Sequence, residues 1–210
     1  MGWIERPPRF FRWLVPGGIF RITDDSSRAG GDAPVVYLTF DDGPIPEVTP
    51  WVLDTLDRYG IKATFFMVAD NARRYPDLLE EVRRRGHRVG NHTFHHLQGA
   101  RVTTRRYLRD VAEADRILHT PLFRPPHGWL RPRQARALRR RYRIVMYDLV
   151  TRDYCRSLDA RRVLDNVRRY ARPGAVIVFH DSLKSRDRLT EALPAAIEWL
   201  QAEGYGFGLL

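Results

Sequence analysis

Residues 39–44 read Thr-Phe-Asp-Asp-Gly-Pro, and this stretch decides the fold that the rest of the chain predicts. The apolar run at residues 35–38 before it is typical of a buried strand. Two carboxylates, Asp41 and Asp42, stand where that strand ends, and a Gly-Pro pair then turns the chain. At a strand end, adjacent side chains can enter one cavity at different depths. One carboxylate can then bind a metal while the other accepts a proton, although Asp-Gly-Pro is also ordinary turn chemistry.

Strand and helix patterns alternate from this point to the C-terminus. Further strands are expected at residues 63–68, 87–91, 121–124, 143–147, 175–179 and 206–210, and helices at 51–56, 76–85, 103–118, 132–141, 158–171 and 189–203. Such alternation implies parallel strands joined by crossover helices. About seven strands of this kind form a barrel or an open doubly wound sheet, and both place functional groups at the carboxyl ends of the strands.

The composition indicates a single globular domain of residues 34–210 behind an N-terminal arm and loop, residues 1–33. The net charge of +11 invites a polyanion as partner, but almost all the basic residues are Arg and no recognition motif accompanies them. We therefore expect no nucleic-acid function. The lone Cys155 excludes an internal disulfide.

The arm contains an aromatic and basic stretch at residues 3–22, followed by an expected exposed loop at residues 24–32. We expect the arm to pack on the domain, and peripheral contact of residues 3–22 with a membrane surface is the alternative. No apolar run reaches the length of a membrane span, and no signal-peptide pattern opens the sequence. The expected location is therefore the cytoplasm or the inner membrane face, and the expected state is a monomer.

Reactive side chains follow most of the expected strands. They are Asp41 and Asp42 after the first strand, His92 and His96 after the third, Arg124 after the fourth, Asp153 and Tyr154 after the fifth, and His180 after the sixth. Two His residues four apart share one face if their segment turns helically. Two imidazoles with one carboxylate suit Zn²⁺ and leave coordination positions for water and substrate. These strand ends therefore predict a metal site, with His95 as a further imidazole nearby.

The sequence resembles polysaccharide deacetylases of the NodB homology type, carbohydrate esterase family 4, over residues 34–210. Five motifs carry the resemblance: Thr-Phe-Asp-Asp-Gly-Pro at 39–44, Asn-His-Thr-x-x-His at 91–96, Arg-Pro-Pro-x-Gly at 124–128, Asp-Tyr at 153–154 and Val-x-His at 178–180. Three positions depart from the family pattern: His127 replaces an aromatic residue, Tyr154 replaces Trp, and Val150 replaces a frequent Asp. These positions are where substrate should bind, so the departures leave the identity of the substrate open.

The resemblance implies a distorted (β/α) barrel and a role for each matched residue. Asp42, His92 and His96 would hold a divalent metal, most often Zn²⁺, with Asp41 as general base and His180 as general acid. Arg124 would hold Asp41, Asp153 would tune His180, Tyr154 and Val178 would line the acyl pocket, and the backbone N–H of His127 would help to bind the oxyanion. Co²⁺ or another divalent ion could replace Zn²⁺.

The expected function is therefore metal-dependent removal of N-linked acetyl groups from an N-acetylated sugar in a glycan such as a chitin oligomer or peptidoglycan. The chemistry of the residues agrees, because a carboxylate held by Arg stays ionised and a His beside Asp favours its cationic form. One alternative is a deacylase of another amide or of an O-acetyl substrate on the same scaffold. An alternative of a different class is a non-catalytic glycan-binding module.

Overall fold

The computed structural model describes residues 5–7, 11–23 and 33–210. The expected loop at residues 24–32 and the arm residues 1–4 and 8–10 lie outside these ranges. The short helix α1 spans Phe11–Leu14.

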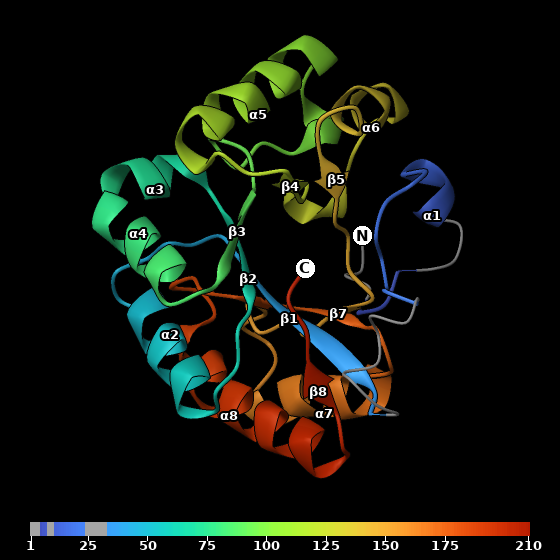
Figure 1. The fold of residues 1–210 in the computed structure, drawn as a ribbon. Coiled ribbons are helices and arrows are strands. Elements are labelled where there is room, and N and C mark those ends of the chain that lie inside the picture. Colours follow the sequence, from blue (N-terminus) through green and yellow to red (C-terminus); the bar gives the residue numbers. More distant parts are fainter. Residues whose placement is uncertain (1–4, 8–10, 24–32) are drawn as a thin grey trace.

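Parallel strands form the centre of the molecule (Figure 1). They are β1 (Val35–Asp41), β2 (Thr64–Met67), β3 (Arg88–Asn91), β4 (Leu122–Phe123), β5 (Arg143–Ile144), β6 (Leu149–Val150), β7 (Val176–His180) and β8 (Gly206–Phe207). Seven of them curl into a half-barrel in the order β5-β4-β3-β2-β1-β7-β6, and β8 pairs with the start of β1. The predicted distorted (β/α) barrel of about seven parallel strands is thus confirmed.

Helices lie around the outside of this sheet (Figure 1). The helices after α1 are α2 (Thr49–Arg58), α3 (Ala69–Arg74), α4 (Pro76–Arg84), α5 (Thr104–Leu118), α6 (Pro132–Leu138), α7 (Ala160–Tyr170) and α8 (Arg186–Ala202), with short 3₁₀ turns η2 (Gly99–Arg101) and η3 (Pro126–Gly128). Every residue of β1 is buried, and the Phe40 ring stacks on Phe65 and Phe179 at centroid distances of 5.0 and 6.0 Å. Because β1 lies at the centre of the sheet, residues 39–44 at its end lie at the centre of the site.

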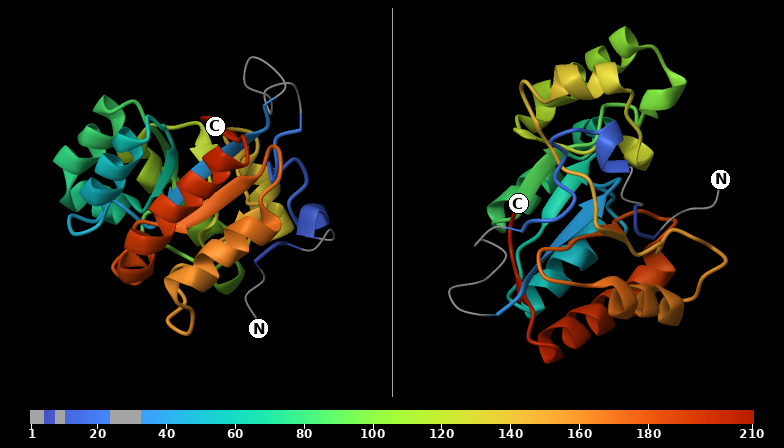
Figure 2. Two further views of the ribbon diagram at one scale, coloured as in Figure 1. Left: turned by 90° about the horizontal axis from the view of Figure 1, so that it is seen from below. Right: turned by 90° about the vertical axis from the view of Figure 1, so that its right-hand side faces the viewer.

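The arm residues 19–22 lie between the two sides of the half-barrel (Figure 2). The Ile19 N–H donates to the carbonyl of Ile144 at 2.8 Å, and the Ile22 N–H donates to that of Gly174 at 2.9 Å. These bonds link the β5 side of the sheet to the segment that leads into β7. Phe20 is 4% exposed and packs in a cluster with residues of α5 and β4. The described part of the arm therefore contributes to the hydrophobic core.

Several element boundaries differ from the sequence prediction, and long-range contacts account for the differences at the arm. The strand expected at 143–147 stops at Ile144, because Met146 donates its N–H to the carbonyl of Ile19 instead. The sequence did not predict β6, whose Val150 N–H donates to the carbonyl of Glu5. Helix α3 was also not predicted, α6 ends three residues early, and α8 begins three residues early. Asp153 therefore follows β6 instead of the longer strand that we expected.

Candidate functional site

A cavity of about 220 Å³ opens where the carboxyl ends of the strands meet. The parallel register places Asp41 at the end of β1 beside His180 at the end of β7. Nine predicted site residues line the cavity: Asp41, Asp42, His92, His96, Arg124, His127, Tyr154, Val178 and His180. Asp153, the tenth, lies behind His180 and is fully buried. The structure therefore brings all ten residues together, and the roles expected for them are taken up below.

Asp41 forms a buried ion pair with Arg124. The Arg124 Nη1 lies 2.6 Å from Asp41 Oδ1 and 2.7 Å from the Thr39 hydroxyl, and Arg124 also donates to the carbonyls of Met146 and Val145. Arg124 is 2% exposed, and its guanidinium carbon lies 4.0 Å from the ring centroid of Phe66. A guanidinium that is held on several sides fixes the orientation of its partner carboxylate.

Asp42, His92 and His96 present a compact set of donor atoms. One atom from each residue lies within 4.8 Å of the other two. The Asp42 Oδ1 is 3.1 Å from His96 Nε2 and 3.8 Å from His92 Nε2. Ligand bonds of about 2.0–2.2 Å at tetrahedral angles would separate donor atoms by similar distances. The set therefore fits one small divalent cation.

The protonation states of these residues also suit a cation. The Nδ1 of His92 donates to the carbonyl of Arg124 at 2.8 Å, which leaves its Nε2 lone pair directed to the site. Burial lowers the pKa of His92 to about 4, so this imidazole is neutral at pH 7. Burial opposes ionisation of Asp42, but its hydrogen bond with His96 and nearby histidines hold its pKa well below the usual range. Metal ligands must be deprotonated in this way.

The segment between His92 and His96 is not helical, so the expectation that a helical turn brings them together is wrong. Thr93 and His96 have φ angles of 65° and 54°, in the left-handed region. The loop is held by side chains instead: Asn91 accepts the Thr93 N–H at 2.8 Å, and the buried Asp110 of α5 accepts the N–H groups of residues 94 and 95. Asp110 also accepts from the His95 ring at 2.6 Å. Among the described residues, His95 is no member of the donor set.

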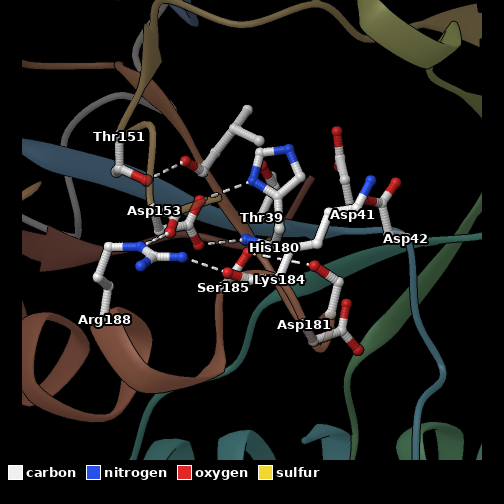
Figure 3. A network of polar contacts seen from close by, with 12 residues as sticks. Thr39, Asp41, Asp42, Thr151, Asp153, His180, Asp181, Lys184, Ser185 and Arg188 are labelled. Atoms are coloured by element: carbon white, nitrogen blue, oxygen red, sulfur yellow. Dashed lines mark hydrogen bonds and ion pairs between the residues drawn. The ribbon is translucent and has the colours of Figure 1, made fainter. Parts of the chain in front are cut away.

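His180 is paired with Asp153 behind the cavity (Figure 3). The His180 Nδ1 donates to Asp153 Oδ1 at 2.8 Å, and its backbone N–H donates to Oδ2 at 2.7 Å. Burial alone would lower the pKa of His180, but the charge of Asp153 and its hydrogen bond outweigh burial and raise that pKa to about 9. The Tyr154 ring meets the His180 ring edge-on at a centroid distance of 4.7 Å. The site therefore holds a protonated imidazole at pH 7.

Another buried carboxyl group, that of Asp181, lies beneath the β1 turn, and the sequence analysis gave it no role. Its Oδ1 accepts the Gly43 N–H at 3.1 Å, and its Oδ2 accepts the Thr49 hydroxyl at 2.6 Å. A Cβ added to Gly43 would lie 2.0 Å from Asp181 Oδ2. Gly43 is therefore required for close approach, and its position next to Asp42 couples Asp181 to the donor set. The one sequence signal for this role was that Asp181 directly follows His180.

The remainder of the cavity wall is mostly apolar. Tyr154 and Val178 are joined there by Val150, which the sequence analysis placed where substrate should bind, and by Met146 and Tyr147, which it did not place. His127 lies beside the donor set, with its ring 4.9 Å from that of His96 and a φ of 58° within η3. The cavity therefore combines an apolar wall with a small set of polar and charged side chains, as small-molecule sites commonly do.

Comparison with known proteins places this arrangement among glycan-modifying enzymes. The family model for polysaccharide deacetylase matches residues 28–145. A peptidoglycan-N-acetylglucosamine deacetylase of Bacillus cereus is 33% identical over 180 residues, which are 82% of this chain and 65% of the length of that relative. A chitooligosaccharide deacetylase of Sinorhizobium fredii is 33% identical over 197 residues, which cover 85% of this chain and 91% of the relative.

The fold similarity extends over almost the whole chain. A crystal structure of a peptidoglycan N-acetylglucosamine deacetylase in complex with 4-naphthalen-1-yl-N-oxidanyl-benzamide gives a TM-score of 0.82 at 28% identity. The superposition covers 97% of this chain and 95% of that chain. The match includes both the half-barrel and the segments that carry the donor set.

Proposed function

Because this chain belongs to the polysaccharide deacetylase family, we propose that it is a metal-dependent hydrolase that removes the N-acetyl group from an N-acetylated sugar in a glycan. The observation that carries this proposal is the grouping, in one cavity, of the Asp42–His92–His96 donor set with the carboxylate of Asp41 and the imidazole of His180. Amide hydrolysis needs these elements together: a site for a divalent cation, a base and an acid.

The donor set would hold the cation, and Zn²⁺ is the ion we propose. Two imidazole nitrogens and a carboxylate oxygen are preferred Zn²⁺ ligands, and three protein ligands leave coordination positions open. A divalent cation bound there lowers the pKa of water and polarises a carbonyl oxygen. Three residues around the donor set fix its geometry: Asn91 and Asp110 hold the His loop, and Asp181 holds the turn next to Asp42.

Asp41 is proposed as the general base. Its carboxylate lines the cavity next to the donor set, since Asp41 Oδ2 lies 4.0 Å from His92 Nε2. The Arg124 guanidinium orients that carboxylate, which would accept the proton of the attacking water. Arg124 acts through Asp41, which makes it a positioning residue.

His180 is proposed as the general acid. Its Nδ1 is occupied by Asp153, so only Nε2 can donate into the cavity. Transfer of the Nε2 proton to the sugar nitrogen lets the C–N bond break as the new C–O bond of acetate forms. The products are acetate and a free amine, and the proton taken up by Asp41 balances the one that His180 gives. No covalent enzyme intermediate is needed.

A second specificity is also compatible with the cavity. The apolar wall that includes Met146 and Val150 would also accept another acyl group, so a deacylase of a different amide or of an O-acetyl ester uses the same machinery. The alternative of a non-catalytic glycan-binding module has little support, because the metal ligands, base and acid are all present and correctly paired. The expected monomeric state stays a prediction.

A substrate panel tests the proposal. The metal-loaded protein is incubated with chitin oligomers, peptidoglycan fragments, simple N-acetyl sugars, and matched N-propionyl and O-acetyl analogues, and the released acid and free amine are quantified. We expect acetate and amine in equal amounts from at least one N-acetylated glycan. Faster turnover of an O-acetyl or N-propionyl analogue than of its N-acetyl counterpart would favour the competing specificity.

A further inference from the structure

Lys184 lies at the mouth of the cavity and has no role in the proposed chemistry. It is exposed, it lines the same cavity as Asp42 and His180, and Figure 3 shows it in the segment that follows β7. Within the described part of the chain it forms no ion pair. A lysine without an acidic partner at the entrance of a binding cavity is available for a ligand.

The backbone that carries Lys184 is firmly held. The Ser185 N–H donates to the carbonyl of Ser182 at 3.0 Å, and the two serine hydroxyls are 3.2 Å apart. Arg188 of α8 donates to the carbonyl of Lys184 and, at 2.5 Å, to that of Asp153 (Figure 3). The position of Lys184 is thereby tied to the segment that orients the imidazole of His180.

The described lining of the cavity leaves Lys184 without a free carboxylate to pair with. Among the described lining residues only Asp41 and Asp42 carry carboxylates, and each already faces a cation or the donor set.

We propose that Lys184 binds an anionic substituent of the glycan, so that the preferred substrate is an acidic glycan and not a neutral one. This inference rests on the proposed function, because it assigns a substrate class to the same cavity. A carboxylate and a phosphate share the necessary chemistry, since both accept hydrogen bonds from an ammonium and attract its charge. The flexible side chain of Lys184 can follow such a group outside the acyl pocket.

The test compares three tetrasaccharides that share an N-acetylglucosamine backbone. One is neutral, one carries lactyl carboxylates on alternate sugars, and one carries a phosphate. For the wild type we expect a lower KM for at least one acidic tetramer. The Lys184→Met variant should raise that KM by roughly 1.5-fold to fivefold, the usual worth of one accessible ion pair, while kcat and the KM of the neutral tetramer stay nearly constant. Which acidic tetramer responds identifies the anion.

Two controls separate charge at this position from other effects. Lys184→Arg should retain the preference, and Arg168→Met, which removes the same charge from an exposed position on α7, should leave it unchanged. Raising NaCl from about 20 to about 300 mM should reduce the preference, because salt screens accessible charges. Equal KM values for the neutral and acidic tetramers in the wild type would overturn the inference, as would an unaltered preference in Lys184→Met.

The experiment distinguishes failure of the proposed deacetylase function from failure of the preference for acidic glycans. If no tetramer releases acetate, that function fails, and calorimetric Kd values of the wild type for the same three tetramers still decide the preference. A lower Kd for an acidic tetramer that Lys184→Met abolishes would support the cationic entrance even then. Indistinguishable Kd values for the three would contradict it.

Discussion

Asp41 and Asp42 are adjacent in the chain, yet their carboxylates face different partners. Asp41 Oδ1 lies 2.6 Å from Arg124 Nη1, whereas Asp42 Oδ1 lies 3.1 Å from His96 Nε2. The left-handed φ of 83° at Asp42 turns the chain between them. Placement alone therefore gives two chemically identical side chains different partners, which is the basis for the different roles we propose for them.

The first prediction separates these two carboxylates. Asp42→Asn should weaken metal binding, because a neutral amide oxygen is a poorer ligand, and excess metal should restore part of the activity. Asp41→Asn should bind metal normally but lose roughly 10²–10⁴-fold in kcat, the usual worth of general acid–base catalysis, and excess metal should not restore it. Metal affinity by calorimetry and acetate release measure the two effects. Loss of metal from Asp41→Asn together with normal binding by Asp42→Asn would reverse the assignment.

The second prediction concerns pH. The pKa of His180 is raised from 6.5 to about 9, so the acid is protonated below that value and activity should fall as the pH rises through it. A bound cation disfavours the imidazolium, which places the alkaline limb of the loaded enzyme at or below about 9. Asp153→Asn removes the charge that raises this pKa, so the limb should move to lower pH by about 1 unit or more. The pH profile of kcat/KM measures the shift.

The free energy of unfolding should also depend on pH through the protonation of His180. A raised folded-state pKa means that the His180–Asp153 pair stabilises the fold fully below pH 6.5 and loses that contribution as the pH rises through about 9. The drop in stability between these values should be smaller in Asp153→Asn than in the wild type. A pH profile of activity that is identical in the two proteins would show that Asp153 does not tune His180.

The third prediction tests the contact between Gly43 and Asp181. Gly43→Ala places a methyl group 2.0 Å from Asp181 Oδ2, so either the turn or the carboxylate must move. We expect a loss of about 1–3 kcal/mol in the free energy of unfolding and weaker metal binding, because Asp42 is the next residue. The double variant Gly43→Ala/Asp181→Ala should recover part of the metal affinity. Strict additivity of the two substitutions would show that they are not coupled.

The fourth prediction concerns the arm. Phe20 is 4% exposed, so Phe20→Ala should lower the free energy of unfolding by about 3 kcal/mol, as measured by urea denaturation. Trp13 is 83% exposed, and Trp13→Ala is the matched control that should leave stability unchanged. If residues 3–22 instead contact a membrane, Trp13→Ala should reduce binding to liposomes. Equal stability of Phe20→Ala and the wild type would contradict packing of the arm. The expected boundary between the arm, residues 1–33, and the domain, residues 34–210, stays a prediction.

The local patterns in the sequence were sufficient for the half-barrel and for the positions of the reactive side chains. The helix predicted at residues 103–118 is α5, and it begins after Thr103, whose hydroxyl accepts the Arg106 N–H. The strand-end rule located the donor set, Asp41 and His180, because their positions depend on which residues follow an apolar run.

Features that depend on distant partners could not be read from the sequence. The His loop is shaped by Asp110, which follows it on α5, and β6 is completed by the carbonyl of Glu5 from the arm. No periodicity signals either contact. Lys184 was likewise overlooked, because its significance comes from the cavity that it borders and not from a motif.

The central claim is that this chain hydrolyses an N-acetyl amide with the help of the cation held by Asp42, His92 and His96. The most direct measurement is acetate release from an N-acetylglucosamine oligomer by metal-stripped protein before and after addition of one equivalent of Zn²⁺. We predict no detectable acetate before addition, and acetate and free amine in equal amounts afterwards. Undiminished acetate release by protein shown to be metal-free, or none from any N-acetylated glycan by protein shown to hold Zn²⁺, would contradict the claim.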